Sequence, residues 1–113
     1  MSEAYIIDAL RTPVGRRNGA LADIHSADLA SVPLSAMLDR VGIDSAEYDE
    51  IILGCIDQIG PQAFDIARTA WLAAGGSEAV PGTTIDRQCG SGQQAVHYPH
   101  RCGEHHHERS RLS

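Results

Sequence analysis

The sequence is poor in aromatic residues and contains no lysine. One Trp, three Tyr and one Phe occur among 113 residues, whereas Ala and Gly are frequent, which favours close-packed helices over a β-sandwich. All nine cationic residues are Arg, and together with 15 acidic residues they give a formal net charge of −6. A chain with this charge offers no basic face for nucleic acid or anionic lipid, so neither is expected as a partner.

Long apolar runs and a regular cysteine pattern are missing as well. The apolar stretch over residues 4–10 is interrupted by Asp8, and no segment has the pattern of a secretory signal or the length of a membrane span. Cys55, Cys89 and Cys102 are odd in number and irregular in spacing, which argues against a disulfide framework. We therefore expect a soluble protein of the reducing cytoplasm, with no membrane partner.

Composition changes sharply near residue 98. Residues 1–97 contain all fifteen Ala, whereas residues 98–113 contain none, and seven of those sixteen residues are His or Arg. The second segment has neither helical nor strand periodicity, and it lacks the apolar residues that would offset the entropy lost on ordering. We predict a folded domain over residues 1–97 and a disordered tail over residues 98–113.

The tail holds one group of potential metal ligands, formed by Cys102 and the three residues His105, His106 and His107. Structural zinc sites use paired ligand groups that are separated by a folded loop. The tail offers no second pair, so we expect no metal site.

The first 97 residues alternate between short apolar segments and segments with helical spacing. Strands are predicted over residues 4–9, 50–55 and 83–85. Helices are predicted over residues 26–41, capped by Ser26, over residues 63–74, and from Gln93 until Pro99 stops the third helix. The order β-α-β-α-β-α predicts an α/β fold in which helices cover a parallel sheet.

Cys89 falls where the third strand leads into the third helix. A thiolate is the effective form of a cysteine nucleophile, and the N-terminus of a helix favours that form. Gly90 and Gly92 carry no side chains, so backbone N–H groups can face an incoming carbonyl oxygen. Spacing alone leaves open a structural cysteine in a Gly-rich turn.

The segment around Cys89 resembles a known family. The run Arg87-Gln88-Cys89-Gly90-Ser91-Gly92-Gln93-Gln94-Ala95-Val96 is similar to the thiolase motif around the acyl-accepting cysteine. Three further segments agree with the family in the same order. Residues 9–15 resemble Ala-x-Arg-Thr-Pro-x-Gly, residues 48–54 resemble Val-Asp-Glu-Val-Ile-Leu-Gly, and residues 66–75 resemble the following helix. The resemblance covers residues 4–97.

The resemblance implies a partial thiolase-like half-domain and an acyltransferase reaction. In thiolases the cysteine that matches Cys89 takes an acyl group from acyl-CoA as a thioester, and a second acetyl-CoA then attacks it. Coenzyme A thioesters are thus the implied substrates, with no bound cofactor. Because family members associate as dimers, a homo-oligomer is also implied.

Other motifs of the family do not occur in this sequence. Thiolases take their acid and base groups from a His in an Asn-x-Asn-Gly-Gly stretch, a Gly-His-Pro and a second Cys in Cys-x-Gly-Gly-Gly. We therefore expect a truncated, catalytically incomplete chain, and we hypothesise a shift of reading frame near codon 98. His97 lies eight residues beyond Cys89 and is expected on exposed helix surface rather than at the sulfur.

Two alternatives remain for the function. One is a non-catalytic remnant, or a fragment that depends on a partner and has no turnover. The other, more remote, is a papain-like thiol protease, because residues 88–91 echo that family's Cys-Gly-Ser-Cys-Trp motif. Gly92 and Gln93 stand where that motif has Cys and Trp.

Overall fold

The computed structural model describes residues 4–99. In chain order, the elements are α1 (Ser26–Val41), the 3-10 turn Ser45–Glu47, β1 (Ile51–Gly54), the 3-10 turn Gly60–Gln62, α2 (Ile66–Ala73), β2 (Gly82–Ile85) and the 3-10 turn Gln88–Gly90. Residues 91–99 are also helical. No helix in this part of the chain combines the length and the apolar character needed to cross a bilayer.

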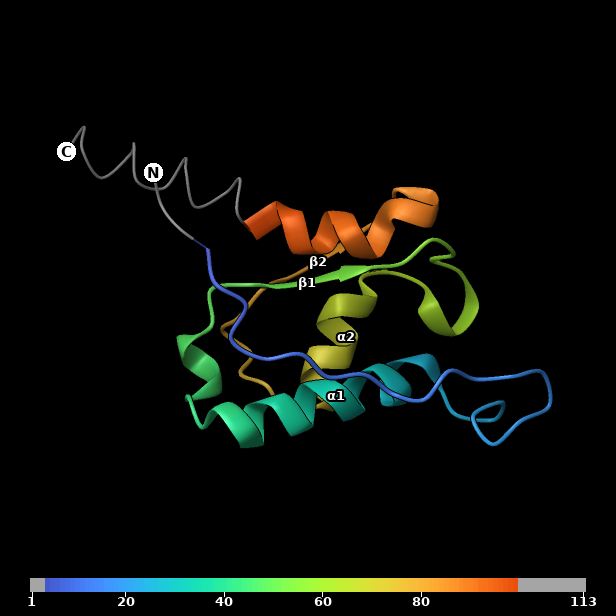
Figure 1. Cartoon of the computed structure of the whole chain (residues 1–113), viewed down its shortest axis with the longest axis horizontal. Helices are drawn as coiled ribbons and strands as arrows, with labels where there is room; N and C mark the ends of the chain where they lie inside the picture. The colour runs from blue at the N-terminus through green and yellow to red at the C-terminus, as the bar shows by residue number, and fades with distance from the viewer. Residues whose placement is uncertain (1–3, 100–113) are drawn as a thin grey trace.

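β1 and β2 form a two-stranded parallel sheet. Their register runs from Ile51 opposite Gly82 to Gly54 opposite Ile85. A parallel pair needs a crossover connection, and α2 supplies it. The helix over residues 91–99 and α2 lie on opposite sides of the sheet, and α1 lies beyond α2 (Figure 1). This arrangement confirms the predicted α/β fold.

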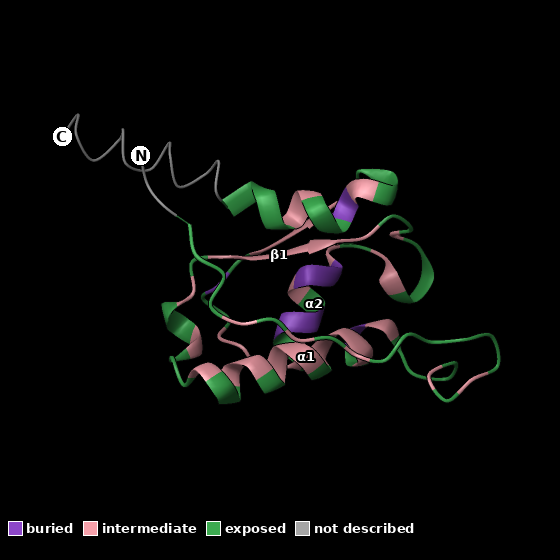
Figure 2. Cartoon of the chain, in the orientation of Figure 1, coloured by how far each residue is buried: buried purple, intermediate pink, exposed green. Residues whose placement is uncertain are grey.

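The core is centred on α2. Its buried residues follow a helical spacing and form one face, drawn in purple in Figure 2: Ile66, Ala67, Ala70 and Trp71. Trp71 is 1% exposed, and its indole N–H donates to the carbonyl of Ser77 at 2.9 Å. Trp71 therefore anchors the packing of the core.

α1 ends at the predicted residue, Val41, but its N-cap lies one residue earlier than predicted. The N-cap is His25 rather than Ser26, because His25 has an extended backbone and its Nδ1 accepts from the N–H of Ala27 at 3.1 Å. Gly42 is left-handed with φ 69°, and its N–H donates to Leu38 at 3.0 Å, as a C-terminal stop does. Pro33 lies inside the continuous helix.

The predicted first strand over residues 4–9 is wrong. No sheet pairing is assigned to residues 4–10, and the side chains of Ile6 and Ile7 are about four-fifths exposed, at 82% and 80%. One ion pair fastens the segment, from Asp8 to Arg40 on α1 at 3.0 Å. Its composition favours a strand, but strand preference depends on neighbouring strands, and within the described residues only β1 and β2 pair.

The prediction that Pro99 stops the third helix is wrong. The helix begins at residue 91 and includes Pro99. A proline inside a helix removes one N–H donor, here the one that would face Ala95. Pro33 shows that this chain accommodates such a loss within a helix. Tyr98 and Pro99 therefore differ from the predicted disorder. Residues 100–113, to which the rest of the tail prediction and the frame-shift hypothesis apply, lie outside the described residues.

Candidate functional site

Cys89 lies in the turn that joins β2 to the helix over residues 91–99. β2 ends at Ile85, and Gln88–Gly90 form a 3-10 turn that leads directly into the helix. The side chain of Cys89 is exposed. The strand–turn–helix setting predicted for Cys89 is therefore confirmed, and the helix begins two residues earlier than Gln93.

Side chains from both ends of the turn hold its backbone. The carboxylate of Asp86 accepts from the N–H of Gln88 at 2.9 Å. The hydroxyl of Ser91 accepts from the N–H of Arg87 at 2.8 Å and donates to the carbonyl of Gln88 at 2.7 Å. Gln88 has φ 48°, a left-handed conformation that non-glycine residues adopt uncommonly. The peptide groups that precede Cys89 are therefore fixed on both sides.

The end of β1 packs against the backbone that follows the turn. A Cβ on Gly54 would lie 2.4 Å from the carbonyl carbon of Ser91 and 2.5 Å from the nitrogen of Gly92. Such distances are far below van der Waals contact, so only glycine allows β1 to approach the start of the helix. Apart from a glycine at the end of a strand, nothing in the sequence predicts this contact.

An open cavity of about 410 Å³ lies beside Cys89. One side comes from the end of β1 and the loop after it, and the other from the turn: Gly54, Cys55, Ile56, Asp57 and Gln62, then Gln88, Cys89, Ser91 and Gly92. The loop is held by the amide of Gln62, which donates to the carbonyl of Asp57 at 2.6 Å. Cys55 is half-buried and lines this cavity.

The two glycines beside Cys89 face open space. A Cβ on Gly92 would meet no atom within 4 Å, and a Cβ on Gly90 would meet only the Arg87 side chain at 3.9 Å. Unlike Gly54, neither is required by contacts within the described residues. Gly92 lines the cavity of Cys89, whereas Gly90 lines a separate hollow that it shares with Arg87 and His97.

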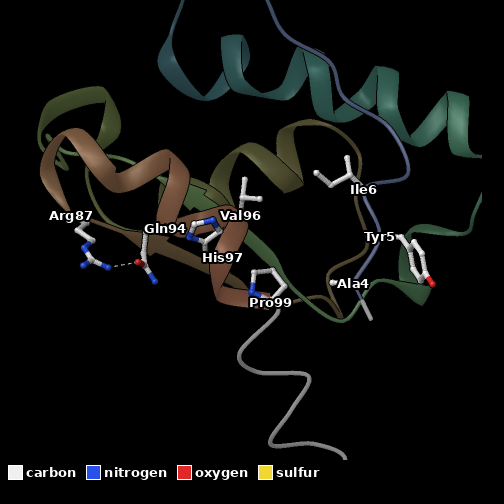
Figure 3. A pocket seen from close by; sticks show the side chains of 8 residues that line it. All are labelled: Ala4, Tyr5, Ile6, Arg87, Gln94, Val96, His97 and Pro99. Atoms are coloured by element: carbon white, nitrogen blue, oxygen red, sulfur yellow. Dashed lines mark hydrogen bonds between the residues drawn. The ribbon is translucent and has the colours of Figure 1, made fainter. Parts of the chain in front are cut away.

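A larger hollow of about 790 Å³ lies between residues 4–6 and the helix over residues 91–99 (Figure 3). His97 lines this hollow, together with Gln94, which accepts a hydrogen bond from Arg87. The other described histidine, His25, caps α1. Among the residues that the structure describes, therefore, no imidazole lines the cavity of Cys89.

The described residues contain no group of three or more His, Cys, Asp or Glu side chains that could hold a metal ion. The potential ligands of the tail, Cys102 and His105 to His107, lie outside the described residues.

Comparison with known proteins gives consistent matches. Residues 4–101 match the family model of the thiolase N-terminal domain. The chain is 58% identical over 98 residues to the steroid 3-ketoacyl-CoA thiolase FadA6 of Mycobacterium tuberculosis, covering 87% of this chain and 24% of that protein. It is 45% identical over 106 residues to the beta-ketoadipyl-CoA thiolase of Pseudomonas aeruginosa, covering 90% of this chain and 26% of that protein.

A solved structure agrees with these sequence matches. The crystal structure of the Bacillus anthracis acetyl-CoA acetyltransferase matches with a TM-score of 0.69 and 44% identity, over 75% of this chain and 21% of that chain. The chain thus spans about a quarter of the length of the curated relatives, which are 24% and 26% covered.

Proposed function

Because this chain belongs to the thiolase family, we propose that Cys89 is the acyl-accepting nucleophile of a thiolase acyltransferase. The observation that carries the proposal is the place of Cys89, exposed in a strand–turn–helix and lining an open cavity. An acyl-transfer nucleophile needs an accessible sulfur with room for the acyl group. Family membership also removes the support for a papain-like protease.

The proposed step is a transfer between two sulfur atoms. The deprotonated sulfur of Cys89 attacks the thioester carbonyl of an acyl-CoA and forms a new carbon–sulfur bond. The bond from that carbon to the sulfur of coenzyme A breaks, and coenzyme A leaves as a thiolate that takes up the proton lost by Cys89. The positive end of the helix dipole over residues 91–99 points at this turn and favours the negative charge that develops on the carbonyl oxygen.

The proposed substrates are coenzyme A thioesters, and no bound cofactor is required. The relatives named above are a steroid 3-ketoacyl-CoA thiolase and a beta-ketoadipyl-CoA thiolase, and the solved structure is an acetyl-CoA acetyltransferase. The chemistry that these names share is a coenzyme A thioester. In this chain the thioester carbonyl would enter the cavity that Cys89 lines together with Gly92.

A second candidate is a non-catalytic thiolase remnant that depends on a partner. One observation favours it, which is that neither His25 nor His97 lines the cavity of Cys89. Proton transfer to and from coenzyme A and the acetyl group needs a positioned base. With residues 4–99 alone, we therefore expect Cys89 to accept one acyl group without repeated turnover.

Mass spectrometry of the chain after incubation with acetyl-CoA or acetoacetyl-CoA tests the proposal. We expect one acetyl group, mapped to Cys89, and one equivalent of released coenzyme A. Cys89→Ser should abolish the adduct, and Cys55→Ser, which removes the other thiol of the same cavity, should retain it. No adduct on the folded wild type would support the remnant instead, and an adduct confined to Cys55 would overturn the role of Cys89.

The chain is also proposed to self-associate in the cytoplasm. Apolar side chains are exposed on the N-terminal segment, on the loop that follows Cys55 and elsewhere, including Ile6, Ile7 and Phe64. Exposed apolar surface of this kind favours association. Sedimentation velocity should show a dimer or larger species, and a monomer at all concentrations would contradict the proposed self-association.

Both described cysteines are free thiols, which fits a reducing compartment such as the cytoplasm.

A further inference from the structure

Ser91 is the only buried polar residue among those that the structure describes, at 4% exposure. It is the first residue of the helix that follows the Cys89 turn. A buried hydroxyl is unfavourable unless it is hydrogen-bonded. The role of Ser91 therefore follows from the partners of its hydroxyl.

Both partners lie in the backbone just before Cys89. The Ser91 hydroxyl accepts from the N–H of Arg87 at 2.8 Å and donates to the carbonyl of Gln88 at 2.7 Å. It therefore spans the turn and ties residues on one side of Cys89 to the helix on the other. The Ser91 backbone rests against Gly54 of β1, so this tie is anchored to the sheet.

The residue held in this way is strained. Gln88 has φ 48°, and a non-glycine residue keeps this conformation only where its surroundings enforce it. Asp86 holds the N–H of Gln88, and Ser91 holds its carbonyl. Neither bond touches the Cys89 side chain. Both fix the peptide groups that determine where that side chain points.

We propose that Ser91, together with Asp86, is a positioning residue for Cys89, and that it aims the thiol at the cavity by holding Gln88 in the left-handed conformation. This inference rests on the proposed function of Cys89. It assigns the Ser91 hydroxyl no contact with the acyl group. Its effect should therefore appear in acyl transfer, which depends on orientation, more than in alkylation by a small reagent.

The test compares Ser91→Ala and Asp86→Ala with Ser77→Ala. The control also removes a serine hydroxyl bonded to a backbone N–H, that of Ala79 at 3.2 Å, but Ser77 does not line the Cys89 cavity. For each variant, acetylation of Cys89 by acetyl-CoA and alkylation of Cys89 and Cys55 by iodoacetamide are followed by mass spectrometry. Circular dichroism verifies the fold.

We expect Ser91→Ala to slow acetylation of Cys89 about tenfold or more, Asp86→Ala to slow it to a lesser extent, and Ser77→Ala to leave it unchanged. Alkylation of Cys55, in the same cavity, should stay within about twofold of wild type. A merely structural role would instead raise alkylation of both thiols together. Acetylation at the wild-type rate in folded Ser91→Ala would overturn the inference.

Two further outcomes remain decisive. If Ser91→Ala does not fold, Asp86→Ala tests the positioning role instead. Asp86 is exposed, and its loss frees the same peptide from its other side. If the wild type accepts no acetyl group, the proposed function fails, and the ratio of Cys89 to Cys55 alkylation tests the inference by itself. That ratio should change about threefold or more in Ser91→Ala and Asp86→Ala but not in Ser77→Ala, and an unchanged ratio would refute the positioning role.

Discussion

Gly54 at the end of β1 lies directly against the backbone of Ser91, where a Cβ would come within 2.4 Å of the Ser91 carbonyl carbon. This contact joins the first strand of the sheet to the start of the helix that follows Cys89. The position of the turn therefore depends on a residue far from it in sequence. The same contact brings Cys55, the next residue after Gly54, to the wall of the Cys89 cavity.

Gly54→Ala should destabilise the chain and displace the Cys89 turn. The added methyl group would meet backbone atoms of Ser91 and Gly92, which cannot move aside as a flexible side chain can. We expect a loss of about 1–3 kcal/mol in the free energy of unfolding, measured by urea denaturation. Alkylation of Cys89 by iodoacetamide should change as well.

Gly92→Ala is the matched control for this prediction. A Cβ on Gly92 meets no atom within 4 Å, and Gly92 lies in the helix over residues 91–99. Replacement of glycine by alanine in a helix stabilises by about 0.5–1 kcal/mol, so this variant should be at least as stable as wild type. Equal losses in the two variants would show that the approach of β1 to the turn is not close.

Thr84 on β2 ties the sheet to the start of α2, and its loss should weaken that junction. Its hydroxyl donates to Asp65, the N-cap of α2, at 2.6 Å and accepts from the N–H of Ala67 at 3.1 Å. Thr84→Val keeps the shape and removes both bonds. We expect a loss of about 1–3 kcal/mol in urea denaturation, because Ala67 is buried and its N–H would be left without a partner.

Thr84→Ser keeps the hydroxyl and should retain most of this stability. A double-mutant cycle of Thr84→Val with Asp65→Ala should give a coupling energy of about 0.5 kcal/mol or more. If the effects of Thr84→Val and Asp65→Ala on the free energy of unfolding are additive, the hydrogen bond between the two side chains contributes nothing to the junction.

Much of the fold could be predicted from local sequence. The apolar segments that correspond to β1 and β2, the helical spacing of α2 and the end of α1 at Val41 are local signals, and the structure confirms each of them. The strand–turn–helix around Cys89 was predictable for the same reason.

The errors have non-local causes. Residues 4–9 have the composition of a strand, but a strand also needs a neighbour to supply its hydrogen bonds. The place of Cys55 in the wall of the Cys89 cavity depends on the turn beside it, which lies far away in the sequence. The hydrogen bonds of the Ser91 hydroxyl span only three and four residues, but they depend on a side-chain rotamer and on the left-handed conformation of Gln88, which no spacing in the sequence reveals.

Gly76→Ala should disrupt the packing of Trp71. A Cβ on Gly76 would lie 2.1 Å from Cε2 of the Trp71 indole, which is buried and has little room to move. We expect a loss of about 3 kcal/mol in the free energy of unfolding. Because the chain has one Trp, its fluorescence reports on this site alone, and the emission should shift to longer wavelength.

Gly15→Ala serves as the control, because a Cβ there would meet only Leu21 at the ordinary distance of 3.7 Å. Its stability should stay within about 0.5 kcal/mol of wild type, with unchanged emission. An unshifted emission maximum in Gly76→Ala would mean that the indole does not pack against this glycine.

His25 should stabilise α1 through its role as the N-cap. Its Nδ1 satisfies the N–H of Ala27, one of the helix N–H groups that have no partner within the helix. His25→Ala should reduce the free energy of unfolding by about 1 kcal/mol, whereas His25→Ser, which offers a hydroxyl oxygen at the same position, should retain or exceed wild-type stability. Urea denaturation gives the stabilities, and amide hydrogen exchange of Ala27 reports the bond directly. His97→Ala removes another exposed imidazole that caps no helix, and it should leave the exchange of Ala27 unchanged. If His25→Ala and His97→Ala proved equally stable, with equal protection of Ala27, the cap would contribute nothing to α1.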